Sequence, residues 1–423
     1  MAKIKFVKAR QVFDSRGFPT VEAEITLENG SFGRAIVPSG ASTGALEAVE
    51  LRDGGDKFAG KGVSKAVENV NNKITPEIIG FDVSDQEKLD KKLIELDGTE
   101  QKSGLGANAI LSVSLAAARA EAGRSPFYEY IAKLYKKAGG DNDISLPLPM
   151  VNVLNGGAHA SGGVDIQEVM LMPVGAKNFD EAMEMTADVF HSLKRVLKES
   201  GQPTTVGDEG GFAPNLNSNE EALELLVNSI KKSRFEYGKD IKLALDIASS
   251  EFYENERYKL SSDNTDLSSA EMVDWVADLA GKYQIISIED GLAEDDWSAW
   301  TKLNTAIGGK IQLVGDDLLV TNPKLLKKAI DKKSANAILI KLNQIGTLSE
   351  TLEAIILAQQ AGWGTVISHR SGETEDVTIS HLAVGTGAGQ IKTGSLSRGE
   401  RTAKYNELIR ISEQIGSNKL ARI

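Results

Sequence analysis

The 423-residue chain is longer than one ordinary domain, so we expect two domains. Hydrophobic residues make up 41% and charged residues 26%, as in soluble globular proteins, and the net charge of −12 argues against a general nucleic-acid-binding protein. Cysteine is absent, which excludes disulfides, thiolate metal ligands and cysteine nucleophiles, and is typical of a reducing compartment.

The N-terminus shows no secretory signal, because residues 1–10 lack the apolar core of a signal peptide. No apolar run elsewhere approaches the ~20 residues needed to cross a bilayer. We therefore expect a cytoplasmic protein with no membrane insertion and no nucleic-acid partner.

The N-terminal part of the chain predicts a compact α+β domain. Residues 3–13, 21–28 and 32–37 alternate apolar and polar side chains, as half-buried strands do. From residue 62 to 137 the pattern becomes helical. Small residues over 106–122 predict a helix that packs closely against another element.

A change of composition marks the predicted domain boundary. Turn-forming residues over 138–143 are followed by Pro147 and Pro149. We therefore expect an N-terminal domain of residues 1–137 and a C-terminal domain of residues 138–423.

The C-terminal domain predicts a (β/α)8 barrel. Short apolar runs end in polar residues and precede helix-compatible stretches, and the last four of these ends recur at intervals of about 25 to 28 residues, one strand–helix unit each. The polar ends are Asp246, Glu289, Asp316, Lys341 and His369. Since the C-terminal ends of barrel strands converge at one mouth, we expect these residues to form one site. A doubly wound open sheet gives a similar alternation but rarely needs functional residues from five successive strands.

Three of these polar ends are carboxylates. A converging set of carboxylates that includes no histidine or cysteine, here Asp246, Glu289 and Asp316, suits Mg²⁺, a hard cation that prefers oxygen ligands. Any one of them could simply end a strand or cap a helix, but three in equivalent positions favour a metal site. Lys341 would be buried at the same mouth, where desolvation and a cation would lower its pKa and make it a base; the alternative is a salt-bridged lysine.

Several loop segments add candidate chemistry. Glu209 lies among glycines at 206–214 and could act as an acid, although the segment alone reads as a turn. Arg370 and Ser371 together suit a phosphate group, and Lys392 adds charge near the next strand. The loop 39–44 could serve as a lid or as an ordinary connection.

These segments together resemble the enolase family over nearly the whole chain. The resemblance rests on the segments FDSRG, SGASTG, EAVELRD, GDEGGFAP, SIEDGLAEDDW, QLVGDDLLVTN, KLNQIGT and SHRSGETED, which follow one another in the family's order. It implies an N-terminal α+β domain followed by an enolase-type TIM barrel that begins irregularly, as ββαα. It also implies the Mg²⁺-dependent, reversible dehydration of 2-phosphoglycerate to phosphoenolpyruvate, with two Mg²⁺ ions per active site.

The resemblance also implies residue roles. Lys341 would remove the substrate proton, Glu209 would protonate the departing hydroxide, and Glu168 and His159 would complete the catalytic group. One Mg²⁺ would be held by Asp246, Glu289 and Asp316, and the second by Ser39 with the substrate phosphate. Substrate contacts would come from His159, Gln167, Lys341, His369, Arg370, Ser371 and Lys392.

The rest of the resemblance concerns assembly and alternatives. It implies a homodimer or a higher oligomer, up to an octamer. The sequence departs from the family at 160–163, where paired glycines predict a more mobile loop. Within the enzymes, the alternative is a racemase or cycloisomerase of the wider superfamily. The other alternative is a non-catalytic surface protein of the plasminogen-binding type, with a secondary cell-surface pool, or a structural protein of this fold.

Overall fold

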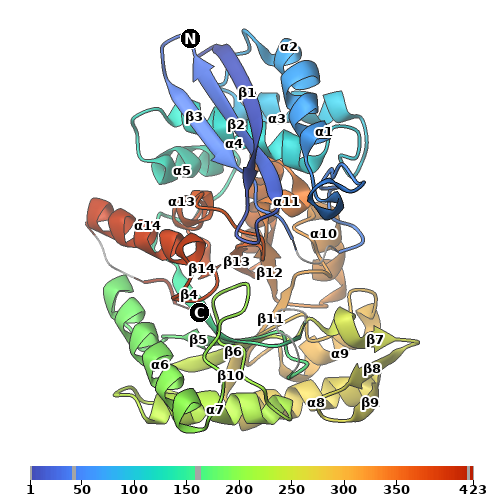
Figure 1. The fold of residues 1–423 in the computed structure, drawn as a ribbon, viewed down its shortest axis with the longest axis vertical. Helices are drawn as coiled ribbons and strands as arrows, with labels where there is room; N and C mark the ends of the chain where they lie inside the picture. Colours follow the sequence, from blue (N-terminus) through green and yellow to red (C-terminus); the bar gives the residue numbers. More distant parts are fainter. Residues whose placement is uncertain (1, 41–43, 158–162, 417–419, 423) are drawn as a thin grey trace.

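A computed structural model describes residues 2–40, 44–157, 163–416 and 420–422. Figure 1 shows a small sheet with its helices (blue to cyan) beside a larger barrel surrounded by helices. The N-terminal domain and the closed eight-stranded barrel were both predicted, and the open-sheet alternative is wrong. Among the described residues, no helix is long and apolar enough to span a membrane.

The N-terminal domain packs an antiparallel sheet against one buried helix. Its strands are β1 (Ile4–Phe13), β2 (Pro19–Leu27) and β3 (Phe32–Ile36), in that order. Its helices are α1 (Ser64–Glu68), α2 (Thr75–Ile78), α3 (Gln86–Asp97), α4 (Ala107–Ala122) and α5 (Phe127–Lys137). Helix α4 approaches the sheet so closely that a Cβ on Gly33 would lie 2.1 Å from the Ala116 carbonyl oxygen. The predicted close packing of this small-residue helix is therefore confirmed.

The barrel closes in the order β10-β11-β12-β13-β14-β4-β5-β6. Its strands are β4 (Leu148–Asn155), β5 (Glu168–Met172), β6 (Lys242–Asp246), β10 (Ile285–Glu289), β11 (Gln312–Gly315), β12 (Ala337–Ile340), β13 (Gly364–Ser368) and β14 (Gly389–Lys392). Strand β5 runs antiparallel to both β4 and β6, whereas the other pairings are parallel. Helices α6 (Phe179–Glu199) and α7 (Asn219–Lys231) follow β5, which gives the expected ββαα beginning.

The remaining helices alternate with strands around the barrel. They are α8 (Ser269–Lys282), α9 (Trp297–Ile307), α10 (Pro323–Lys332), α11 (Leu342–Ile345), α12 (Leu348–Gln360), α13 (Thr378–Gly385) and α14 (Gly399–Ile415). A small sheet that we did not predict, β7 (Tyr253–Glu254), β8 (Arg257–Leu260) and β9 (Thr265–Ser268), lies between β6 and α8 in the chain.

Polar side chains determine where several barrel helices begin. The Ser268 hydroxyl accepts the Glu271 N–H at 3.4 Å, and the Glu271 carboxylate accepts the Ser268 N–H at 2.8 Å, so α8 begins with a capping box. Asn178 caps α6 in the same way by accepting the Glu181 N–H. Fixed helix starts set the length of the loops that leave the strand ends.

Helix α12 has its own N-cap, Thr347, which accepts the Glu350 N–H, but the N-terminal domain supplies the partners of its first two N–H groups. Asp90 on α3 accepts hydrogen bonds from the Ser349 N–H at 2.9 Å and the Ser349 hydroxyl at 2.6 Å. The Ser114 hydroxyl on α4 accepts the Leu348 N–H at 3.1 Å. The first N–H groups of a helix have no acceptor within the helix. Side chains of the N-terminal domain supply this acceptor for α12, so the same hydrogen bonds that cap the helix also join the two domains.

Candidate active site

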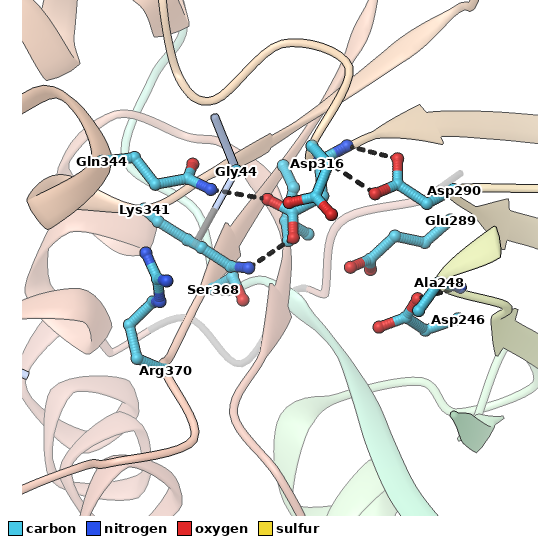
Figure 2. Close-up of polar contacts among 12 residues, drawn as sticks. Gly44, Asp246, Ala248, Glu289, Asp290, Asp316, Lys341, Gln344, Ser368 and Arg370 are labelled. Atoms are coloured by element: carbon cyan, nitrogen blue, oxygen red, sulfur yellow. Dashed lines mark hydrogen bonds and ion pairs between the residues drawn. The ribbon is translucent and has the colours of Figure 1, made fainter. Parts of the chain in front are cut away.

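The barrel mouth gathers most of the predicted site residues around one cavity. The predicted residues that line it are Gln167, Glu168, Glu209, Asp246, Asp316, Lys341, His369, Arg370, Ser371 and Lys392. Figure 2 shows the Asp246 and Glu289 carboxylates pointing toward the space beside Asp316 and Lys341. They meet there because the C-terminal ends of the parallel strands lie at the mouth together with the N-terminal end of the antiparallel strand β5, which carries Glu168, whereas Glu209 comes from the turn at 206–214.

Three carboxylates lie at one level on adjacent strands. Glu168 on β5 pairs in register with Asp246 on β6, which pairs in turn with Glu289 on β10. Lys392, at the end of β14, places its Nζ 3.1 Å from Glu168, 2.9 Å from Asp246 and 2.9 Å from Glu289. Lys392 is therefore paired with three carboxylates of the protein at once.

The electrostatics of this group follow from its burial. Burial, together with the charge of Asp246, raises the pKa of Glu289 well above its usual range. Burial and the charge of Glu209 do the same to the pKa of Glu168. Burial alone would lower the pKa of Lys392, but the surrounding carboxylates outweigh it and raise that pKa, so Lys392 remains an ammonium. Lys392 therefore lies as a cation beside two carboxyl groups, Glu168 and Glu289, that bind protons more readily than they would in water.

Asp316 is fixed from both sides. Its own N–H donates to Asp290 at 2.9 Å, its carboxylate accepts the Gln344 amide at 2.9 Å, and it forms an ion pair with Lys341 (Figure 2). Asp290 also accepts the Asp317 N–H at 2.9 Å, so one buried carboxylate holds two successive backbone groups. We did not predict Asp290 or Gln344; the signal for Asp290 was its position directly after Glu289.

The ion pair sets the protonation state of Lys341. Burial lowers the pKa of Lys341, but the charge of Asp316 outweighs burial and raises that pKa above its ordinary value. In the protein alone, Lys341 is therefore a salt-bridged ammonium, and the lowering of its pKa by burial together with a cation stays a prediction. The same pairing lowers the pKa of Asp316, although burial by itself would raise it.

Glu209 is enclosed by polar side chains from two segments, strand β4 and the loop that follows β13. Its Oε2 accepts the Asn152 amide at 3.1 Å and lies 3.4 Å from Nε2 of His369. Its Oε1 accepts the Ser371 hydroxyl at 3.3 Å. Burial lowers the pKa of His369 to about 4, so the imidazole is neutral near pH 7. The turn at 206–214 thus delivers a carboxylate into the cavity.

Arg370 is paired with a residue of the N-terminal domain. Its Nη1 lies 2.9 Å from Oε2 of Glu47, and both side chains are buried. Glu47 also accepts the Gly44 N–H at 3.1 Å and the Gln344 amide at 3.1 Å. We did not predict Glu47 as a site residue, although it lies in one of the family-like segments. It holds the arginine that we expected to bind phosphate.

Two parts of the chain match known families. Residues 4–131 match the family described as enolase, N-terminal domain, and residues 143–421 match enolase, C-terminal TIM barrel domain. The chain belongs to the enolase family. Membership indicates an enzyme of the lyase type, in a family that typically uses Mg²⁺.

The carboxylates of this enolase-family barrel fit a divalent cation. Asp246, Glu289 and Asp316 are buried oxygen donors, and repulsion between the first two helps to raise the pKa of Glu289. The three carboxylates are less tightly grouped than we predicted. Lys392 lies between Asp246 and Glu289, and Lys341 pairs with Asp316. Among the described residues, two groups of three acidic or histidine side chains place possible metal-ligating atoms within 4.8 Å of one another. They are Glu168–Glu209–His369 and Asp290–Asp316–Asp317.

Ser39 does not lie with these carboxylates. Its hydroxyl accepts Arg52 Nη2 at 2.6 Å and donates to Glu50 at 3.1 Å, and it lines a second cavity. An oxygen held by a guanidinium is a poor cation ligand, so the metal role of Ser39 stays a prediction that requires its hydroxyl to leave these two partners. Gln167 does reach the group, donating to Asp246 at 3.3 Å. His159 and most of the 160–163 loop lie outside the described residues.

Proposed function

We propose that this protein catalyses the reversible, Mg²⁺-dependent dehydration of 2-phosphoglycerate to phosphoenolpyruvate. The observation that carries the proposal is the single cavity lined by Lys341, Glu209 and the Arg370–Ser371 pair. An amine, a carboxyl group and an anion-binding pair are the groups that this elimination needs. The lysine base with magnesium is the known pattern of the enolase superfamily, so that pairing is expected from the family.

The first step is removal of the proton from C2 of the substrate. Lys341 would accept this proton as a neutral amine, which requires that its ion pair with Asp316 be weakened. Asp246, Glu289 and Asp316 would hold Mg²⁺, which when bound offsets the negative charge that builds on the substrate carboxylate. Because Ser39 is engaged by Arg52 and Glu50, we propose no protein ligand for the second Mg²⁺.

The second step is departure of the C3 hydroxide. Glu209 would donate a proton to this oxygen, and Glu168 adjoins it with a pKa raised by burial and by the charge of Glu209. Carboxyl groups that repel each other in a buried site share protons readily, which favours an acid at neutral pH. Both side chains are buried, which limits their contact with bulk water during the proton transfer.

The substrate anions would be held by arginine and lysine side chains. Arg370 and Ser371 would bind the phosphate, which requires the phosphate to displace Glu47 from Arg370. Lys392, permanently charged, would attract the substrate carboxylate. The homodimer or octamer and the surface-binding alternative stay predictions from the resemblance, and the cytoplasmic location stays a prediction from the sequence pattern.

The test follows phosphoenolpyruvate by its ultraviolet absorbance, with Mg²⁺ and then with excess chelator. In parallel, exchange of the C2 proton of 2-phosphoglycerate is measured in deuterated water. Lys341→Ala should abolish exchange and turnover, whereas Glu209→Gln should keep exchange and lower turnover by roughly 10²–10⁴-fold. Lys324→Ala is the matched control, because Lys324 is 79% exposed. A folded wild type without turnover would overturn the proposal, and exchange that survives in Lys341→Ala would overturn its base.

A further inference from the structure

Arg401, near the start of α14, is a completely buried arginine that none of the proposed steps uses. Its guanidinium donates to the Arg370 carbonyl at 2.7 Å, to the Asp208 carbonyl at 3.0 Å and to the Ser371 carbonyl. It therefore connects the loop that carries Glu209 with the loop that follows β13. Burying a guanidinium is costly unless it makes several hydrogen bonds, so the site must retain these contacts.

The same guanidinium fixes the hydrogen positions on His369. Nη1 of Arg401 lies 2.5 Å from Nδ1 of His369. A guanidinium has five N–H donors and no acceptor, so Nδ1 must offer its lone pair. In a neutral imidazole the hydrogen then resides on Nε2, the nitrogen that lies 3.4 Å from Oε2 of Glu209. Burial, which lowers the pKa of His369 to about 4, keeps the ring in this neutral form.

This tautomer determines where Glu209 holds a proton. Its Oε2 faces two N–H donors, the Asn152 amide at 3.1 Å and Nε2–H of His369. A carboxyl hydrogen on Oε2 would collide with them, so the acid form of Glu209 carries its hydrogen on Oε1. With the other tautomer, the Nε2 lone pair would face Oε2 of Glu209 and would accept a hydrogen bond from the carboxyl group, which would draw the hydrogen of Glu209 to Oε2 and away from Oε1.

We propose that Arg401 is a positioning residue that holds His369 as the Nε2–H tautomer and thereby reserves the transferable proton for Glu209. The consequence for catalysis rests on the proposed function, whereas the tautomer itself does not. The two are therefore tested by separate measurements.

The first measurement is ring ¹⁵N NMR of protein labelled at histidine, without substrate. Protonated and unprotonated ring nitrogens resonate far apart, and the chain has only four histidines. His369→Gln identifies the His369 signals by their loss. In the wild type, Nδ1 of His369 should be unprotonated and Nε2 protonated. The opposite assignment would overturn the proposal even if every Arg401 variant failed to fold.

The second measurement compares Arg401→Met and Arg401→Lys. Methionine keeps most of the bulk and removes the donor, so the His369 signals should shift toward the other tautomer or an average of both. Lysine keeps a cationic N–H donor group that can reach Nδ1 of His369, so Arg401→Lys should restore the wild-type signals in part. His381, whose Nε2 lies 3.2 Å from Glu407, serves as an internal control and should keep its signals. Unchanged His369 signals in folded Arg401→Met would contradict the proposal.

Kinetics separate positioning from a general structural role. In Arg401→Met, the carboxyl hydrogen of Glu209 is no longer kept on Oε1, so the rate of dehydration should fall about 10-fold or more. The rate of C2 proton exchange depends on Lys341 and should stay near wild type. An equal loss of both rates would contradict the positioning role. Arg124→Met, at an exposed arginine, is the matched control and should change neither rate. If the wild type has no turnover, the proposed function fails while the NMR result still decides the tautomer.

Discussion

The ammonium group of Lys392 lies at the barrel mouth among carboxylates from several strands. Lys392 contacts Glu168, Asp246 and Glu289, which come from three adjacent strands, and all four side chains are buried. This ammonium group is therefore needed for the stability of the fold, because removing one partner of a buried ionic network leaves the other charges uncompensated.

We predict that Lys392→Met lowers the free energy of unfolding by about 3–5 kcal/mol in chelator, since three buried carboxylates lose their cation. Added Mg²⁺ should restore part of this loss, because it binds the same carboxylates only in the folded state. Urea unfolding with and without Mg²⁺ measures both effects. Lys324→Met should lose less than about 0.5 kcal/mol, and a Lys392→Met protein as stable as wild type in chelator would refute the assigned role.

A second prediction concerns acid stability. The pKa of His369 is about 4 in the folded protein and 6.5 ordinarily, so between these values the unfolded chain binds the extra proton. The free energy of unfolding should therefore rise with pH across this window, and His369 should destabilise the protein as pH falls through it, by an amount on the order of a few kcal/mol. Urea unfolding of wild type and His369→Gln from pH 4 to 7 tests this: the difference between the two should vary with pH, and a constant difference would contradict it.

The residues that the sequence revealed are those with a regular position in the chain. Asp246, Glu289, Asp316 and Lys341 each follow an apolar strand, so the barrel repeat made them visible. Glu47 acts from the other domain and Arg401 from a helix start, and neither position belongs to that repeat. Their roles depend on contacts between distant segments, which spacing does not encode.

At the scale of elements, the helices and strands that could be predicted were those with a clear apolar periodicity, a continuous apolar run or a helix-capping residue. The five barrel strands that end in or before Asp246, Glu289, Asp316, Lys341 and His369 have clear apolar runs, although β11 and β12 are only four residues long. Strands β7 to β9 are as short and are interrupted by charged residues such as Glu254, Arg257 and Asp266, so they show neither an apolar run nor a readable alternation. Register with their neighbours, rather than local preference, determines their structure.

The capping box of α8 gives a prediction at this scale. Ser268→Ala removes the acceptor for the Glu271 N–H and should cost about 1 kcal/mol. Turnover should be unchanged, because the cap lies outside the cavity. Urea unfolding measures the loss, and the adjacent Ser269→Ala, which removes no cap, should cost much less. Equal losses in both variants would show that the capping box adds nothing.

At the scale of the whole molecule, the two domains share one helix start. Asp90 and Ser114 belong to the N-terminal domain, but the N–H groups that they accept belong to α12 of the barrel. Arg370 and Glu47 form a second link of the same kind. The domains should therefore unfold together.

Tryptophan fluorescence tests this coupling directly, because all four tryptophans (Trp275, Trp297, Trp300 and Trp363) lie in the barrel. Asp90→Ala leaves two α12 groups without their acceptor and should shift the fluorescence-detected transition by about 1–3 kcal/mol. Glu87→Ala, on an exposed position of the same helix, is the control. A transition that does not move would mean that the barrel unfolds independently.

The closed order of the barrel also has a consequence for synthesis on the ribosome. Strand β4 pairs with β14, and β14 ends with Lys392, so the seam and its cation are made last. Glu168, Asp246 and Glu289 all emerge earlier in the N-to-C order of translation. A growing chain that brought β5, β6 and β10 together would collect acids with no lysine among them. Mutual repulsion would then delay assembly of the mouth until the final strand arrives, so the cation that stabilises the finished site also times its formation.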